Sequence, residues 1–294
     1  MPLSHILIAS DFSKHAGFAL QRAVALAKHN QAALDFVHVL TQSWMANLLR
    51  LPAQETQAKL LKAKQESEKK LFDLLSDETQ SKSFKVAVLI GRAAEEIASY
   101  AKNNQCDLVI VGAHGEYYIN DYVLGTTPAS IVGQGNIPVL MIKKQPTVAY
   151  QRILIATDFS NASKKAVQFT FDCFPEASFQ LLHVADVNYQ RVFNVEISHP
   201  SLSDNSQTQE IWYKFDEFLN ECQVDKTRFE KKMIGGYTAD SVVRQAEKWK
   251  ADLLAFGNQG HSKLHYLLMG SVAQRIMHLS RFDMLAVPAS YASS

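Results

Sequence analysis

A glycine pattern that occurs twice constrains this chain more than any other feature. In each copy, two residues separate the first two glycines, nine separate the second from the third, and a hydroxyl residue follows the third. Glycines spaced in this way suit a loop whose backbone approaches an anion before a helix begins. The two copies are Gly112, Gly115, Gly125 and Thr126, and Gly257, Gly260, Gly270 and Ser271. The pattern therefore predicts both an internal duplication and a kind of ligand site.

The duplication extends well beyond the glycines. Ile-Leu-Ile-Ala-Ser-Asp-Phe-Ser at 6–13 returns as Ile-Leu-Ile-Ala-Thr-Asp-Phe-Ser at 153–160, and His38-Val39 returns as His183-Val184. From the histidines onward, the matching residues lie a constant 145 positions apart. Each copy has an ordinary domain length. We therefore expect two domains, at residues 1–146 and 150–294, joined by a short linker.

The amino-acid composition indicates which partners and which cellular compartment to expect. The 30 basic and 29 acidic residues nearly cancel, so a nucleic-acid partner is not expected. Cys106, Cys173 and Cys222 have no paired spacing, which favours free thiols in a reducing cytoplasm over a disulfide or a metal site. No segment has the pattern of a signal peptide or a membrane span, so a membrane association is not expected either.

Short apolar runs alternate with longer helical patterns, which predicts an α/β fold built on parallel sheets. The helix near 209–222 carries an apolar face that we expect to be core. The expected strands lie near 5–10, 34–40, 84–90, 107–112 and 138–142 in the first copy, and near 152–157, 179–184, 227–234, 252–257 and 283–287 in the second.

The repeated residues follow these strands, and ligands of open parallel sheets bind at the carboxyl ends of strands. An Asp there can accept from a ribose hydroxyl, a small β-branched residue can pack on a base, and free amides at a helix start can hold phosphate oxygens. Taken singly, the same residues are ordinary turn and helix-cap residues. The joint spacing favours a mononucleotide site formed by Asp158, Val184, Gly257, Gly260, Gly270 and Ser271. A weaker second site comprises Asp11, Val39, Gly112, Gly115, Gly125 and Thr126.

These motifs resemble the universal stress protein family, in its tandem-domain form, over essentially the whole chain. The resemblance implies two doubly wound domains, each a five-stranded parallel sheet of order 3-2-1-4-5 with helices on both faces. It also implies ATP, or ADP or AMP, as the ligand, with Mg2+ carried by the phosphates, because the glycine pattern marks the ATP-binding branch. The family pairs domains through their last strands, which implies an internal pseudo-dimer and allows a homodimer.

The two copies differ where the phosphates are expected. The second loop carries Lys263, whereas the first carries Glu116 and Asp121, which oppose anion binding. Pro128 also departs from the family pattern in the first copy, although it fits a first helical turn. We therefore expect nucleotide mainly in the second domain.

Three kinds of function remain open. The first is a stress-response regulator that binds an adenine nucleotide, the second a nucleotide-free scaffold for an unknown protein partner, and the third a slow ATPase. The sequence contains no Walker-type phosphate loop, nucleophile elbow or His-Glu-x-x-His motif, so we expect no catalytic or metal-binding residues.

Overall fold

A computed structural model describes residues 3–41, 44–45, 52–78, 84–113, 125–185, 206–260 and 269–291. Contacts divide the chain into two compact units. The N-terminal unit comprises Pro2–Ile131 and Val139–Pro146, and the C-terminal unit comprises Thr147–Ser294 with Val132–Pro138. Within the described ranges, no helix is both long and apolar enough to cross a membrane.

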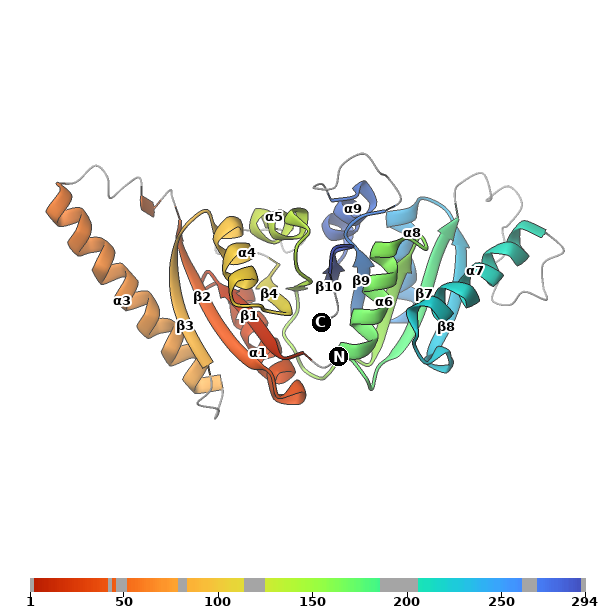
Figure 1. Ribbon diagram of the computed structural model, residues 1–294, viewed down its shortest axis with the longest axis horizontal. Coiled ribbons are helices and arrows are strands. Elements are labelled where there is room, and N and C mark those ends of the chain that lie inside the picture. The colour runs from red at the N-terminus through yellow and green to blue at the C-terminus, as the bar shows by residue number, and fades with distance from the viewer. Residues whose placement is uncertain are drawn as a thin grey trace. The chain divides into compact units, whose positions relative to one another are not determined.

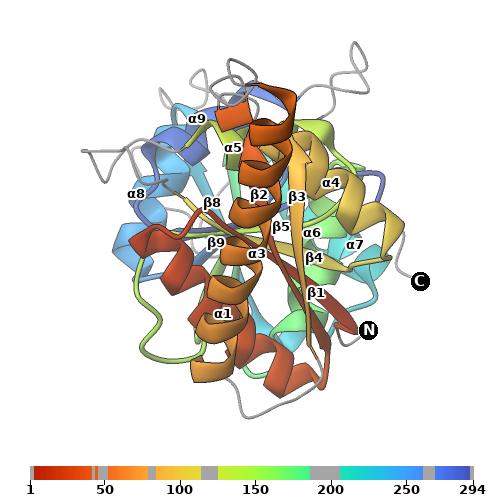
Figure 2. The same ribbon diagram turned by 90° about the vertical axis from the view of Figure 1, so that its left-hand side faces the viewer.

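The N-terminal unit is a parallel sheet of order β3-β2-β1-β4-β5 flanked by helices (Figures 1 and 2). Its elements alternate along the chain, as a doubly wound fold requires. They are β1 (His5–Ser10), α1 (Lys14–Asn30), β2 (Ala33–Thr41), α3 (Ala53–Glu78), β3 (Phe84–Gly91), α4 (Ala93–Asn103), β4 (Leu108–Gly112), α5 (Thr126–Gln134) and β5 (Val139–Ile142).

The C-terminal unit repeats this topology with parallel neighbours in the order β8-β7-β6-β9-β10. The predicted fold class and strand order are therefore confirmed for both units. Its elements are β6 (Arg152–Thr157), α6 (Asn161–Cys173), β7 (Ser178–Ala185), α7 (Ser206–Cys222), the short 3-10 helix η3 (Lys226–Arg228), β8 (Phe229–Gly235), α8 (Thr238–Trp249), β9 (Leu253–Gly257), α9 (Ser271–Leu279) and β10 (Asp283–Val287).

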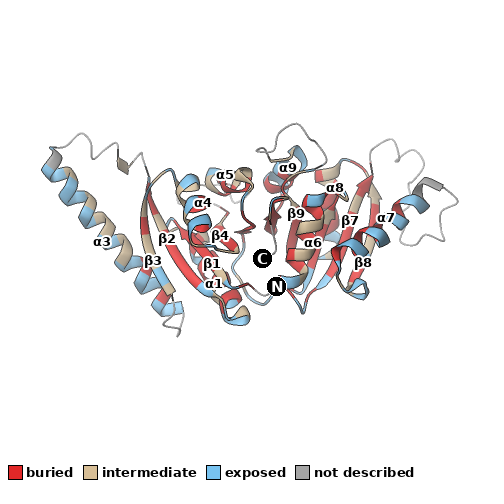
Figure 3. Cartoon of the chain, in the orientation of Figure 1, coloured by how far each residue is buried: buried red, intermediate tan, exposed pale blue. Residues whose placement is uncertain are grey.

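The apolar runs of the central strands are buried because helices cover both faces of each sheet (Figure 3). Ile6, Leu7 and Ile8 of β1 are fully buried, as are Ile153, Leu154 and Ile155 of β6. The apolar face predicted on α7 is also core. Its members Ile211, Trp212, Phe215, Phe218, Leu219 and Cys222 are all buried.

The repeated Asp-Phe-Ser segment is a hydrogen-bonded corner between strand and helix. In the C-terminal unit, Thr157 Oγ1 accepts from Phe159 N at 2.9 Å and Asp158 Oδ1 accepts from Ser160 N at 3.0 Å. These bonds hold Phe159 at a φ of 62°, which a bulky residue rarely adopts. The N-terminal unit has the same corner, with Phe12 at a φ of 65°. Asp158 therefore has a structural role as well as any role toward a ligand.

The first glycine of each pattern is required by packing between strand and helix. A Cβ at Gly257 would lie 2.6 Å from the carbonyl carbon of Ala162, and one at Gly112 would lie 2.8 Å from that of His15. Contacts this short cannot be accommodated without moving backbone. The glycines therefore let the start of α6 or α1 approach the end of β9 or β4.

Gly112→Ala is expected to lower the free energy of unfolding by about 1–3 kcal/mol, because the new methyl group overlaps the backbone of α1. Gly17→Ala is the matched control. Gly17 lies within α1 with no described atom within 4 Å of an added Cβ, so alanine should stabilise the helix by up to about 1 kcal/mol. Urea denaturation of both variants tests this contrast. Equal stability of the two would contradict the packing argument.

Candidate functional site

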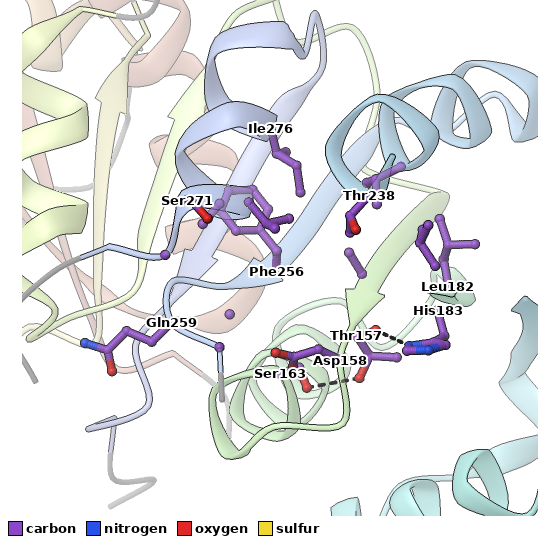
Figure 4. Close-up of a pocket in the computed structure, with 18 residues that line it drawn as sticks. Thr157, Asp158, Ser163, Leu182, His183, Thr238, Phe256, Gln259, Ser271 and Ile276 are labelled. Atoms are coloured by element: carbon purple, nitrogen blue, oxygen red, sulfur yellow. Dashed lines mark hydrogen bonds between the residues drawn. The ribbon is translucent and has the colours of Figure 1, made fainter. Parts of the chain in front are cut away.

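A cavity of about 320 Å³ opens at the carboxyl ends of β6, β7 and β9 in the C-terminal unit (Figure 4). The starts of α8 and α9 close it from the other side. All six residues predicted for the main site line this cavity. They are Asp158, Val184, Gly257, Gly260, Gly270 and Ser271.

Several lining residues were not predicted from the sequence. Thr157, Ser163, Thr238 and Gln259 add polar groups, and His183 lies beside Val184 on β7. The only signal for His183 was its repetition with Val184, and Thr238 carried none. The apolar part of the wall is formed by Ala156, Leu182, Val242, Phe256, Val272, Ala273 and Ile276.

The N-terminus of α9 supplies hydrogen-bond donors to one wall. Its N-cap is Gly270, which has no side chain to cap the first turn. Ser271, Val272 and Ala273 form that turn, and all three line the cavity. The first backbone N–H groups of a helix have no partner within the helix, and its dipole makes this end positive. The wall is therefore suited to an anion.

The opposite wall carries a carboxylate and hydroxyl groups. Asp158 is exposed to the cavity after β6, with Oδ1 held by Ser160 N. Thr157 Oγ1 donates to Ser163 Oγ at 3.0 Å, which fixes both hydroxyls at the base of this wall (Figure 4). Among the lining residues that the structure describes, Asp158 is the one carboxylate, and there is no lysine, arginine or cysteine.

His183 is held in one tautomer by the backbone. Its Nδ1 lies 3.0 Å from the carbonyl oxygen of Thr157, which can only accept, so Nδ1 carries a hydrogen. The ring packs on Phe159 with centroids 4.7 Å apart and meets Phe215 edge-on. Burial lowers the pKa of His183, partly opposed by the Thr157 hydrogen bond and by Asp158. The imidazole is therefore neutral at neutral pH.

The glycines of the C-terminal pattern differ in the contacts that a Cβ would make at each position. Gly257 is required by helix packing, and a Cβ at Gly260 would lie 3.0 Å from Asp158 Oδ2. At Gly270 the backbone is ordinary, with φ −63° and ψ 145°, and the nearest atom to an added Cβ is 3.6 Å away. The described part of the fold thus leaves room for a Cβ at Gly270, and a side chain there would stand before the first turn of α9.

The N-terminal unit brings together five of its six predicted residues at the equivalent edge. Asp11 follows β1, Val39 lies near the end of β2, and Gly112 ends β4. Gly125 N donates to Ala113 O at 2.8 Å, as Gly270 N does to Asn258 O, and Thr126 begins α5. The sixth residue, Gly115, lies outside the described residues, as do Lys263, Glu116 and Asp121.

The helix starts of the two units differ in one donor. Pro128 is the third residue of α5, and Ala273 is the third residue of α9. Proline has no backbone N–H, so the first turn of α5 offers one donor fewer than that of α9. This difference is independent of the charges in the two loops.

Comparison with known proteins agrees with this architecture. The model of the universal stress protein family matches the chain twice, over residues 2–143 and 149–288. A universal stress protein of Methanocaldococcus jannaschii is 30% identical over 142 residues, covering 47% of this chain and 82% of that protein. A second one from the same organism is 26% identical over 153 residues, covering 48% of this chain and 94% of that protein. Each match is about the length of one unit.

A tandem-length structure is also similar. The crystal structure of a universal stress protein from Archaeoglobus fulgidus covers 97% of this chain and 98% of that chain, with a TM-score of 0.65 and 15% sequence identity. At this level of identity the likeness concerns the fold.

The lowered pKa of His183 makes stability depend on pH. Below about pH 6.5 the unfolded imidazole takes up a proton that the native one resists, so native stability falls as pH falls. His183→Asn, which keeps a donor for Thr157 O, should reduce the slope of unfolding free energy between pH 7 and pH 5 by up to about 1.4 kcal/mol per pH unit. Urea denaturation across this range measures it. An unchanged slope would mean that His183 is protonated as readily in the native chain as in the unfolded one.

Proposed function

The chain belongs to the universal stress protein family, and we propose that its C-terminal unit binds an adenine nucleotide as the signal that this protein responds to. The phosphates would lie at the first turn of α9, and the nucleoside would lie between Asp158 and Val184. The cavity volume, about 320 Å³, falls at the lower end of the range usual for small-molecule sites.

One observation carries the proposal, namely the uncapped start of α9 facing the cavity. Among the residues that the structure describes, a Cβ at Gly270 would meet only ordinary contacts, so packing against them does not explain why glycine stands there. A phosphate that approaches the amides of Ser271, Val272 and Ala273 does explain it. The same anion would gain from the helix dipole.

The remaining walls suit a nucleoside. The Asp158 carboxylate can accept from ribose hydroxyls, since an ionised carboxylate only accepts. Val184, Phe256 and Ile276 offer apolar surface to a base. With a single described carboxylate in the lining, a protein cage for Mg2+ has no support, so Mg2+ would be held chiefly by the phosphates of ATP.

We assign the protein to regulation rather than catalysis. The described lining holds no cysteine or lysine nucleophile, and the one histidine is tied to Thr157 through Nδ1. A difference between two states of the protein in their affinity for ATP, ADP or AMP would then set which state predominates. Cys106, Cys173 and Cys222 are thiols and form no disulfide, which supports a reducing compartment, the cytoplasm, for this activity.

Gly270→Val tests the proposal with little risk to folding. The new side chain should block the amides of α9 and weaken nucleotide binding at least about tenfold, which corresponds to the loss of one hydrogen bond to a charged group. Unfolding free energy should fall by no more than about 1 kcal/mol, the order of the cost of a poor N-cap residue, because the nearest described atom to an added Cβ is 3.6 Å away. Calorimetric titration of the purified full chain with ATP, ADP and AMP, with and without Mg2+, measures the effect.

Gly125→Val at the matching position compares the two units. If Gly125→Val lowered nucleotide affinity more than Gly270→Val, the N-terminal unit would be the main nucleotide site. If the unmodified chain neither retains nor binds any of the three nucleotides, the proposal is wrong and a nucleotide-free interaction scaffold becomes the better reading.

A further inference from the structure

We propose that the N-terminal unit holds a Zn2+ ion between His5, Asp35 and Cys106, at the amino-terminal edge of its sheet. This is the edge opposite the carboxyl ends of the strands, so the site is separate from the nucleotide crevice and does not depend on it. One ligand atom of each residue lies within 4.8 Å of the other two. Cysteine spacing does not predict this cluster, because its members are far apart in the sequence.

The sheet brings the three residues together. His5 begins β1, Asp35 lies near the start of β2, and Cys106 lies just before β4; β1 is paired with both other strands. A backbone clamp holds the edge in place. Asp107 N donates to His5 O, and Asp107 Oδ2 accepts from Ser4 N at 2.7 Å and His5 N at 2.9 Å. Asp107 directly follows Cys106, so its hydrogen bonds hold the backbone beside Cys106 against the backbone of His5.

The orientation of His5 is that of a metal ligand. Its Nδ1 lies 3.0 Å from the carbonyl oxygen of Asn104, so Nδ1 carries a hydrogen and donates it. The neutral ring then turns the lone pair of Nε2 toward Asp35 Oδ1, 3.1 Å away. Histidines that bind metals commonly donate their other N–H to a carbonyl in this way.

Two acceptors that face each other need a cation between them. Nε2 of His5 is buried, and within the described residues it has no hydrogen bond of acceptable geometry, although Asp35 Oδ1 is near. The separation of 3.1 Å is close to the value of about 3.4 Å for nitrogen and oxygen ligands on tetrahedral Zn2+. A proton on Nε2 is the competing answer, and it would make an ion pair of His5 and Asp35.

Asp35 is 2% exposed, so its charge needs compensation. Tyr100 Oη donates to Asp35 Oδ2 at 2.9 Å, which leaves Oδ1 directed at His5. The Tyr100 hydroxyl orients the carboxylate as a supporting residue of a metal site would. The nearest lysine in register, Lys85 on β3, is exposed.

Cys106 completes the donor set. Its Sγ lies within 4.8 Å of the ligand atoms of His5 and Asp35. A metal ion would bind the thiolate and release the thiol proton to solvent. Nitrogen, oxygen and sulfur together favour Zn2+ and disfavour Mg2+ and Ca2+, which prefer oxygen ligands.

The C-terminal unit shows that the fold does not require these side chains. At the equivalent positions stand Arg152, Gln180 and Ala251, with Gln245 in place of Tyr100. Gln245 Nε2 donates to Gln180 Oε1 at 2.7 Å, and Arg152 lies over the Trp249 ring. Gln180 Nε2 in turn donates to Glu230 Oε1 at 2.9 Å. A hydrogen-bonded set of polar side chains therefore occupies the corner where the N-terminal unit carries three chelating groups.

The C-terminal unit therefore indicates which substitutions the same fold can accommodate at these positions. Cys106→Ala and His5→Arg copy the C-terminal unit. The tag-free, chelator-treated full chain should bind one Zn2+ in competition with a chromophoric chelator, and either substitution should weaken binding at least about 100-fold. Co2+ should give a thiolate charge-transfer band that Cys106→Ala removes. The controls are Cys222→Ala, at a buried thiol outside the cluster, and His29→Gln, at an exposed histidine, and both should keep Zn2+ and the cobalt band.

Two results would overturn the proposal. The first is a folded wild-type chain, verified by circular dichroism, that binds no Zn2+; His5 and Asp35 would then be a proton-bridged ion pair. The second is Zn2+ binding that survives both Cys106→Ala and His5→Arg with unchanged affinity. A rise in melting temperature with Zn2+, present in the wild type and absent in Cys106→Ala, provides a readout independent of the titration.

Discussion

The contact between a glycine that ends a strand and the backbone that begins a helix underlies both units. Gly257 lets α6 pass against the end of β9, and Gly112 does the same for α1 and β4. Because the helix start lies so close, the preceding corner must turn sharply, with Phe159 in the left-handed region. That turn directs Asp158 to the crevice while its Oδ1 stabilises the turn. The site in the C-terminal unit thus follows from a backbone packing requirement.

The duplicated scaffold carries different chemistry at its two edges. At the carboxyl edge, the C-terminal unit has a helix start with three donors, whereas Pro128 removes one from the N-terminal unit. At the amino-terminal edge the contrast runs the other way, since the N-terminal unit gathers His5, Asp35 and Cys106. Under the two proposals, the units have specialised separately: the C-terminal unit for an anion at the carboxyl edge of its sheet, and the N-terminal unit for a cation at the amino-terminal edge of its own.

The sequence was most informative where local pattern and repetition coincide. The strands were predicted because parallel strands covered on both faces are continuous apolar runs, and the six crevice residues because strand ends share one edge of the sheet. The ligand-based explanation of the first glycine was incomplete, since Gly257 serves helix packing. Gly270 has no close contact of this kind among the described residues. Thr238 and the His5–Asp35–Cys106 cluster were missed. Their proximity depends on tertiary contacts between segments that carry no shared motif.

Amide-resolved hydrogen exchange of the full chain, with and without ATP, tests the central claim most directly. The backbone N–H groups of Ser271, Val272 and Ala273 are the proposed phosphate ligands, and their exchange should slow when ATP binds. The first turn of α5, at Thr126 and Thr127, should be affected less. ATP binding that leaves the α9 amides unprotected, or that protects the α5 turn instead, would contradict the account.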